Sequence, residues 1–117
     1  MSDDPNLFRS VASVLGSDGR FRVVGDDLHC DGSSAPLTNI YSIENLESDW
    51  EDWQPGDSGM RNPVRMSSLI FETRSPAWVA EVGLILAQAL GTQVWFVDSA
   101  GVAWRVGEVD PGRIALA

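Results

Sequence analysis

Residues 75–106 read SPAWVAEVGLILAQALGTQVWFVDSAGVAWRV, the longest continuous apolar stretch of the chain, and predict one helix followed by one β-hairpin. Ser75 is a good N-cap because its hydroxyl can accept a backbone N–H of the first turn, and Pro76 suits the first helical position, where no N–H is needed. Gly91 stands where a glycine in the left-handed conformation would end the helix. The predicted helix therefore covers residues 76–90.

The apolar residues of this helix recur at helical spacing. The stripe and the residues that widen it are Trp78, Val82, Ile85 and Ala89, with Val79, Leu86 and Leu90. Only Glu81 and Gln88 are polar between Trp78 and Leu90, and they lie on one face. We therefore expect the helix to expose a narrow strip and to bury the rest.

The hairpin is predicted from strands over 93–98 and 102–106 around a turn at 99–101 that ends in glycine. Asp98 can accept a hydrogen bond from its own backbone two residues further on. Alternation places Trp95 and Val97 on one face of the first strand, while the opposite face is also apolar. Either this strand is covered on both sides, or one face is an interface.

The rest of the chain predicts a single α+β domain of 117 residues with two layers. Asp4, Pro5 and Gly16 bound a short N-terminal helix over 5–15. Further strands are expected at 21–24, 28–30, 36–43, 63–74 and 113–116. We predict an antiparallel sheet of five to seven strands, packed by the helix 76–90 and by the helix 5–15.

The charge of the chain limits its partners. The formal net charge is −9, and all eight basic residues are arginines. Such a balance disfavours nucleic acid and anionic membranes as partners and permits a basic protein. An acidic, polar N-terminus and a single cysteine, Cys30, favour a cytoplasmic protein without a disulfide. A domain of this length needs neither a metal nor a disulfide to form a core. We expect it to be a monomer or a homodimer.

The segment 44–62 differs in character from the rest. It holds six of the seventeen acidic residues, two tryptophans and several helix-breaking residues, and it predicts a long loop with one helical turn over 46–53. Tryptophan is frequent in interface hot spots, and surrounding carboxylates can attract a basic partner. The predicted partner-binding residues are Glu47, Asp49, Trp50, Glu51, Asp52, Trp53 and Asp57. In the alternative interpretation, both tryptophans cover the core and the acidic side chains are simply solvated.

Two short motifs suggest chemistry but lack the necessary partners. Residues 56–59, GDSG, match the surroundings of a serine-protease nucleophile, a chemistry that needs a histidine base held by a carboxylate. The only histidine is His29, which adjoins Cys30, so these two side chains should point to opposite faces of a strand. A zinc site would need three or four such ligands. The sequence therefore predicts no catalytic residue, no metal site and no cofactor, and we expect a protein that is not an enzyme.

The residues 75–110 resemble the C-terminal part of small immunity proteins, the partners that neutralise bacterial polymorphic or contact-dependent toxins. The features that carry the resemblance are the helix VAEVGLILAQALG, the strand VWFVD, and VAWRV before VDPGRI. The resemblance implies a non-enzymatic inhibitor whose acidic surface occludes a toxin domain. The alternative is a structural or adaptor domain that self-associates through the sheet face bearing Trp95 and Val97.

Overall fold

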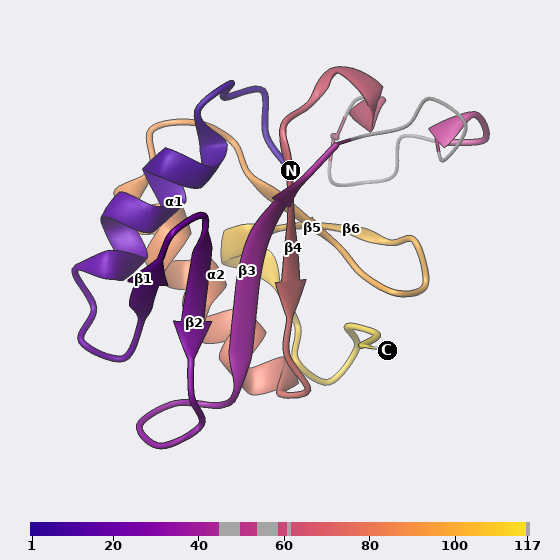
Figure 1. Ribbon diagram of the computed structural model, residues 1–117. Helices are drawn as coiled ribbons and strands as arrows, with labels where there is room; N and C mark the ends of the chain where they lie inside the picture. Colours follow the sequence, from indigo (N-terminus) through magenta and orange to yellow (C-terminus); the bar gives the residue numbers. More distant parts are fainter. Residues whose placement is uncertain (45–49, 54–58, 61, 117) are drawn as a thin grey trace.

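The computed structural model describes residues 1–44, 50–53, 59–60 and 62–116, and it has the predicted α+β class (Figure 1). Two α-helices are present, α1 (Leu7–Gly16) and α2 (Pro76–Ala89). The strands are β1 (Arg22–Val24), β2 (Asp27–Cys30), β3 (Thr38–Ile43), β4 (Ser68–Glu72), β5 (Trp95–Val97) and β6 (Ala103–Arg105). Two 3-10 helices complete the described elements, η2 (Pro63–Arg65) and η3 (Val106–Glu108).

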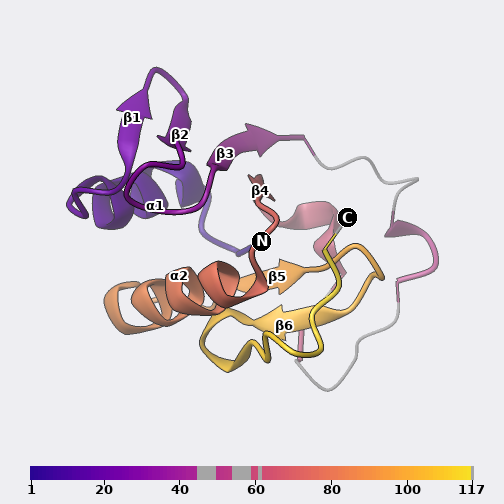
Figure 2. The same ribbon diagram turned by 90° about the horizontal axis from the view of Figure 1, so that it is seen from below.

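The strands form two sheets, so the prediction of one sheet of five to seven strands is not confirmed. The first is an antiparallel sheet in the order β1-β2-β3-β4, and the second is the hairpin β5-β6. Figure 2 views β4 nearly end-on while β5 and β6 run across the view, so the sheets have different directions. The strand predicted at 63–74 shortens to β4 because a 3-10 helix occupies 63–65, and residues 113–116 form no strand.

The backbone of the first two residues joins the two sheets. Ser2 exchanges hydrogen bonds with Ser67, just before β4, through N–O distances of 3.1 and 2.8 Å. On its other side the chain pairs with β5, where the Met1 amino group donates to the Trp95 carbonyl at 2.7 Å and the Trp95 N–H donates back to the Met1 carbonyl at 2.9 Å. Because Ser2 is antiparallel to both neighbours, the backbone at Ser67 and the backbone at Val94 run in the same direction at this joint, before β4 and β5 diverge.

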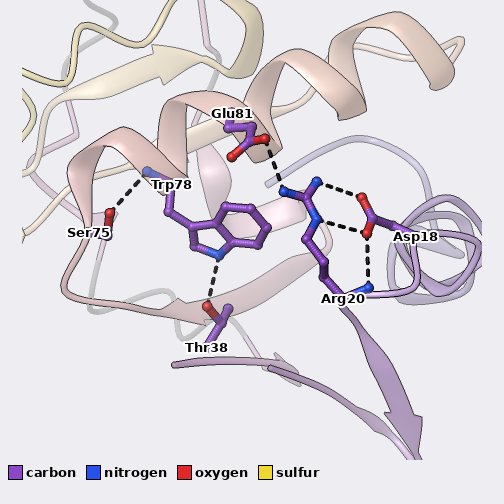
Figure 3. Close-up of polar contacts among 6 residues, drawn as sticks. All are labelled: Asp18, Arg20, Thr38, Ser75, Trp78 and Glu81. Atoms are coloured by element: carbon purple, nitrogen blue, oxygen red, sulfur yellow. Dashed lines mark hydrogen bonds and ion pairs between the residues drawn. The ribbon is translucent and has the colours of Figure 1, made fainter. Parts of the chain in front are cut away.

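The indole of Trp78 attaches α2 to the larger sheet (Figure 3). Its Nε1–H donates to the Thr38 hydroxyl at 2.9 Å, and its ring stacks on Phe21 with 5.6 Å between centroids. The Arg20 guanidinium lies 4.8 Å from the centre of the same ring. Asp18 accepts two hydrogen bonds from that guanidinium, at 2.9 and 2.7 Å, which lower the pKa of Asp18 to about 2. Glu81 of α2 accepts a third from the same group at 3.1 Å.

Burial on α2 differs in part from the prediction. The Ser75 hydroxyl caps the helix as expected, and Trp78, Val79, Val82 and Leu86 are buried. The exposed strip is wider than predicted, since Leu84 is 50% exposed and Ala87 and Ala89 also face solvent. Gly91 does not adopt a left-handed conformation, because the helix ends at Leu90 in an extended conformation.

The N-terminal helix begins later than predicted, at Leu7. Asp4 still stabilises this end, because its carboxylate accepts hydrogen bonds from the Asn6 N–H at 2.8 Å and from the Ser10 hydroxyl at 2.7 Å. Gly16 is the last residue of α1 rather than the residue after it. The buried face of the helix carries Leu7, Val11 and Leu15, as the predicted pattern requires.

The second face of β5 is covered by the chain itself. Trp95 is only 7% exposed and forms a cluster with Met60 and Met66. Met1 and Trp53 pack against the same cluster, together with Val97. Side chains of this chain therefore cover Trp95, while Val97 on the same face is only partly buried.

Gly83 allows α2 to approach the 3-10 helix η3 closely. A Cβ at this position would lie 2.0 Å from the Val106 carbonyl oxygen and 3.1 Å from a ring carbon of Phe96.

We predict that Gly83→Ala lowers the free energy of unfolding by about 2–4 kcal/mol, because the clash outweighs the roughly 1 kcal/mol by which alanine favours a helix. Urea denaturation measures this difference. The matched control Gly91→Ala, where the new Cβ meets nothing within 4 Å, should stay within about 0.5 kcal/mol of the wild type. Equal stability of both variants would contradict the clash.

Burial of the Met1 amino group lowers its pKa to about 5. An unfolded chain binds the corresponding proton below about pH 8, whereas the folded chain binds it only below about pH 5. The unfolded state therefore holds more protons between these values, and stability should rise from pH 5 to pH 8, by a few kcal/mol at most.

Urea denaturation at several pH values, on a preparation whose mass shows that Met1 is retained, measures this trend. A His29→Gln variant, which lacks the only imidazole, should show the same rise. A free energy of unfolding that stays flat or falls between pH 5 and pH 8 would mean that the folded protein holds this amino group charged.

Candidate functional site

The structure describes four of the seven predicted partner-binding residues. Trp50, Glu51, Asp52 and Trp53 form a turn that is closed by a hydrogen bond from the Trp53 N–H to the Trp50 carbonyl, at 3.1 Å. Glu47, Asp49 and Asp57 lie outside the described residues, and so does most of the predicted GDSG motif. We call residues 50–53 the tryptophan turn.

Within the tryptophan turn the two indoles meet edge to face. Their centroids lie 5.6 Å apart with 77° between the ring planes. Trp53 is half-buried and packs against the cluster of Met60, Met66 and Trp95. Its indole Nε1–H is buried and has no hydrogen-bond partner in the part of the chain that the structure describes. Trp50 is also half-buried. Trp53 therefore covers the core, as the alternative interpretation had it, and at the same time supports the ring of Trp50.

The carboxylates of the turn point to solvent. Glu51 and Asp52 are exposed, and neither forms an ion pair with the arginines that the structure describes. Glu44 is exposed as well. The arrangement therefore combines a supported aromatic ring with unpaired negative charge, which suits contact with a basic surface.

His29 and Cys30 lie on opposite faces of β2, as alternation predicts. Cys30 is buried in the main core, and this burial raises the pKa of its thiol. His29 faces outward, where its Nδ1 lies 2.8 Å from the Asn39 side-chain oxygen. Because that oxygen can only accept, Nδ1 carries the proton. Across residues 1–44, 50–53, 59–60 and 62–116, no group of three His, Cys, Asp or Glu side chains could hold a metal ion.

A row of polar side chains crosses the outer face of the larger sheet, and the sequence analysis did not identify it. The registers place Arg22 opposite His29, His29 opposite Asn39, and Asn39 opposite Glu72. The Tyr41 hydroxyl donates to the Glu72 carboxylate, an interaction that raises the pKa of Tyr41. Each of these strands carries at least one polar residue, but only the register, which the sequence does not show, brings Arg22, His29, Asn39 and Glu72 into one row.

Two cavities lie where the sheets diverge, and no sequence pattern indicated them. The inner cavity, of about 340 Å³, lies between β4, β5 and the two α-helices. The outer cavity, of about 830 Å³, lies between the end of β4 and the start of the hairpin turn. Apolar residues line most of the inner cavity, whereas the outer one also has polar residues such as Glu72, Thr73 and Ser99 in its lining. These residues come from separate segments, which only the angle between the sheets brings around a common space.

Asp98 holds the hairpin turn and the C-terminal tail beside these cavities. One carboxylate oxygen accepts the N–H groups of Ala100 and Val102 at 3.0 and 2.9 Å. The other accepts the Trp104 indole N–H at 3.0 Å and the Ala115 N–H at 3.2 Å. Burial tends to raise the pKa of Asp98, but these hydrogen bonds outweigh it and hold the pKa below its ordinary value. The predicted bond to its own backbone two residues on is thus confirmed.

Comparisons with protein families, with curated proteins and with solved structures found no match. Within the described part of the chain, no helix is both long enough and apolar enough to cross a membrane.

Proposed function

We propose that this protein is a non-enzymatic inhibitor that binds a basic protein, in the manner of the immunity proteins that neutralise bacterial toxin domains. The observation that carries the proposal is the tryptophan turn, in which Glu51 and Asp52 are exposed beside the half-buried ring of Trp50 and form no ion pair with a described arginine. The net charge of −9 adds a long-range attraction for a positively charged partner.

The mechanism is occlusion. Trp50 supplies apolar area at a low cost in conformational entropy, because Trp53 already restricts its ring. Glu51 and Asp52 pair with arginine or lysine side chains around the active site or substrate groove of the toxin. Bound in this way, the inhibitor blocks access of substrate and performs no chemistry. The site of action would be the cytoplasm of the bacterium that produces the toxin.

The experiment takes the toxin domain encoded next to the gene of this protein. Co-expression should restore the growth of cells that produce the toxin domain, and the two purified proteins should form a complex measurable by calorimetry. Glu51→Gln/Asp52→Asn should weaken the complex about tenfold and reduce its dependence on salt, because two charge pairs are lost. The control Asp26→Asn/Asp27→Asn, an equal charge change at the exposed β1–β2 turn, should leave affinity within about twofold.

Trp50→Ala tests the aromatic contact. We expect a loss of affinity of about 10- to 100-fold with an unchanged fold by circular dichroism, because the ring is only half-buried in the free protein. Full affinity and full protection of the cells by Trp50→Ala and by Glu51→Gln/Asp52→Asn would exclude the tryptophan turn as the binding surface. The absence of any complex with the toxin domain would contradict the immunity function itself.

A further inference from the structure

The inner cavity is almost entirely apolar. It is lined by side chains of both α-helices and both sheets, among them Leu86, Leu69, Ile70 and Trp95, and Asp98 is the only ionisable side chain in its described lining. Its volume, about 340 Å³, falls within the range of roughly 300–1,000 Å³ typical of small-molecule sites. An apolar space of this size that stays empty forfeits the contacts of its whole lining, so a molecule that fills it stabilises the fold.

The inner and outer cavities adjoin each other. They share the lining residues Phe71, Val97, Asp98 and Leu116, which come from the end of β4, the end of β5 and the C-terminal tail. Beyond these shared residues the lining becomes polar, with Asn39 and the exposed Arg74. The combined space is therefore apolar at its inner end and polar at its mouth.

The charges around the mouth restrict the head group of such a molecule. Asp98 and Glu72 are negative and Arg74 is positive, which leaves a net negative charge in a protein that is itself strongly acidic. An anionic head group is therefore repelled. A cationic one lies beside the positive Arg74, and the Asp98 carboxylate already accepts four hydrogen bonds. Glu72 keeps one oxygen beyond the Tyr41 hydroxyl, but it is exposed to solvent, where an ion pair adds little. A head group that is uncharged and can form hydrogen bonds fits this mouth best.

We propose that the two cavities form one binding site for an uncharged amphipathic small molecule, with an apolar chain between the sheets and a hydroxyl-type head group near Asn39 and Arg74. Trp50 of the tryptophan turn contributes to the lining of the inner cavity, whereas Glu51 and Asp52 line neither cavity. Removal of the Glu51 and Asp52 charges should therefore leave ligand binding unchanged, and filling of the cavity should leave the charge-dependent part of partner binding unchanged.

The experiment titrates the full chain with decan-1-ol and follows binding by calorimetry and by the rise in unfolding temperature. Decanoate and decyltrimethylammonium, which carry the same chain and a charged head group, are the comparison ligands. We expect saturable binding of one decan-1-ol per chain, with at least about tenfold weaker binding of both charged ligands. Each of these must give up part of its hydration, and decanoate meets a mouth of net negative charge while decyltrimethylammonium meets Arg74. Equal affinity for either charged ligand would overturn the assignment of an uncharged head group.

Variants locate the bound molecule. Val97→Phe fills the passage between the two cavities and should weaken decan-1-ol binding at least tenfold. The matched control Val102→Phe, on the exposed side of the same hairpin, should bind as the wild type does. Should Val97→Phe fail to fold, Ile70→Phe on β4 fills the inner cavity instead, with Val24→Phe on the exposed β1 as its control. Binding that persists in the folded cavity-filling variants, or that is absent from the wild type, would overturn the proposal.

Discussion

The buried indole of Trp78 is the contact on which the arrangement of α2 and the larger sheet depends. This one side chain of α2 contacts β3 through the Thr38 hydroxyl. It also contacts the connection between α1 and β1, through the Phe21 ring and the Arg20 guanidinium. A buried indole N–H without a partner would be costly, and Thr38 is itself buried, so each residue satisfies the other. The ion pairs of Arg20 are partly exposed and add little stability alone, but they hold the guanidinium over the ring.

Local signals in the sequence were reliable where the chain contacts its near neighbours. Ser75 and Pro76 begin α2, and Asp98 with Gly101 forms the hairpin turn, because capping and turn formation depend on a few adjacent residues. The α+β fold class, and the helix α2 followed by the β5–β6 hairpin, could therefore be predicted from the sequence. The way in which the two sheets are joined could not be predicted, because it depends on Ser2 pairing with Ser67 and Val94, residues far away in the chain. The same holds for Gly83, whose close approach to Val106 has no local signature.

The candidate site was only partly predictable for a related reason. Composition drew attention to residues 44–62, yet Trp50 and Trp53 have different roles that depend on the position of Met60, Met66 and Trp95. Neither the polar row from Arg22 to Glu72 nor the cavities could be found before strand register and sheet angle were known. A surface formed by one continuous segment can be recognised in the sequence. A surface formed by several strands can be recognised only when the fold is known.

The joint at Ser2 also bears on the order in which the chain can fold. Residue 2 is synthesised long before residues 67 and 94, with which it pairs, so its hydrogen bonds close only after most of the domain has been made. The β1–β2–β3 meander and α2 consist of nearer contacts and can form earlier, since closing a long loop costs entropy before any distant contact compensates for it. Until then, the backbone N–H and C=O groups of Ser67 and Trp95 that later pair with residues 1 and 2 have no partner from this segment. During synthesis this boundary is the part of the domain most exposed to wrong pairing with another chain.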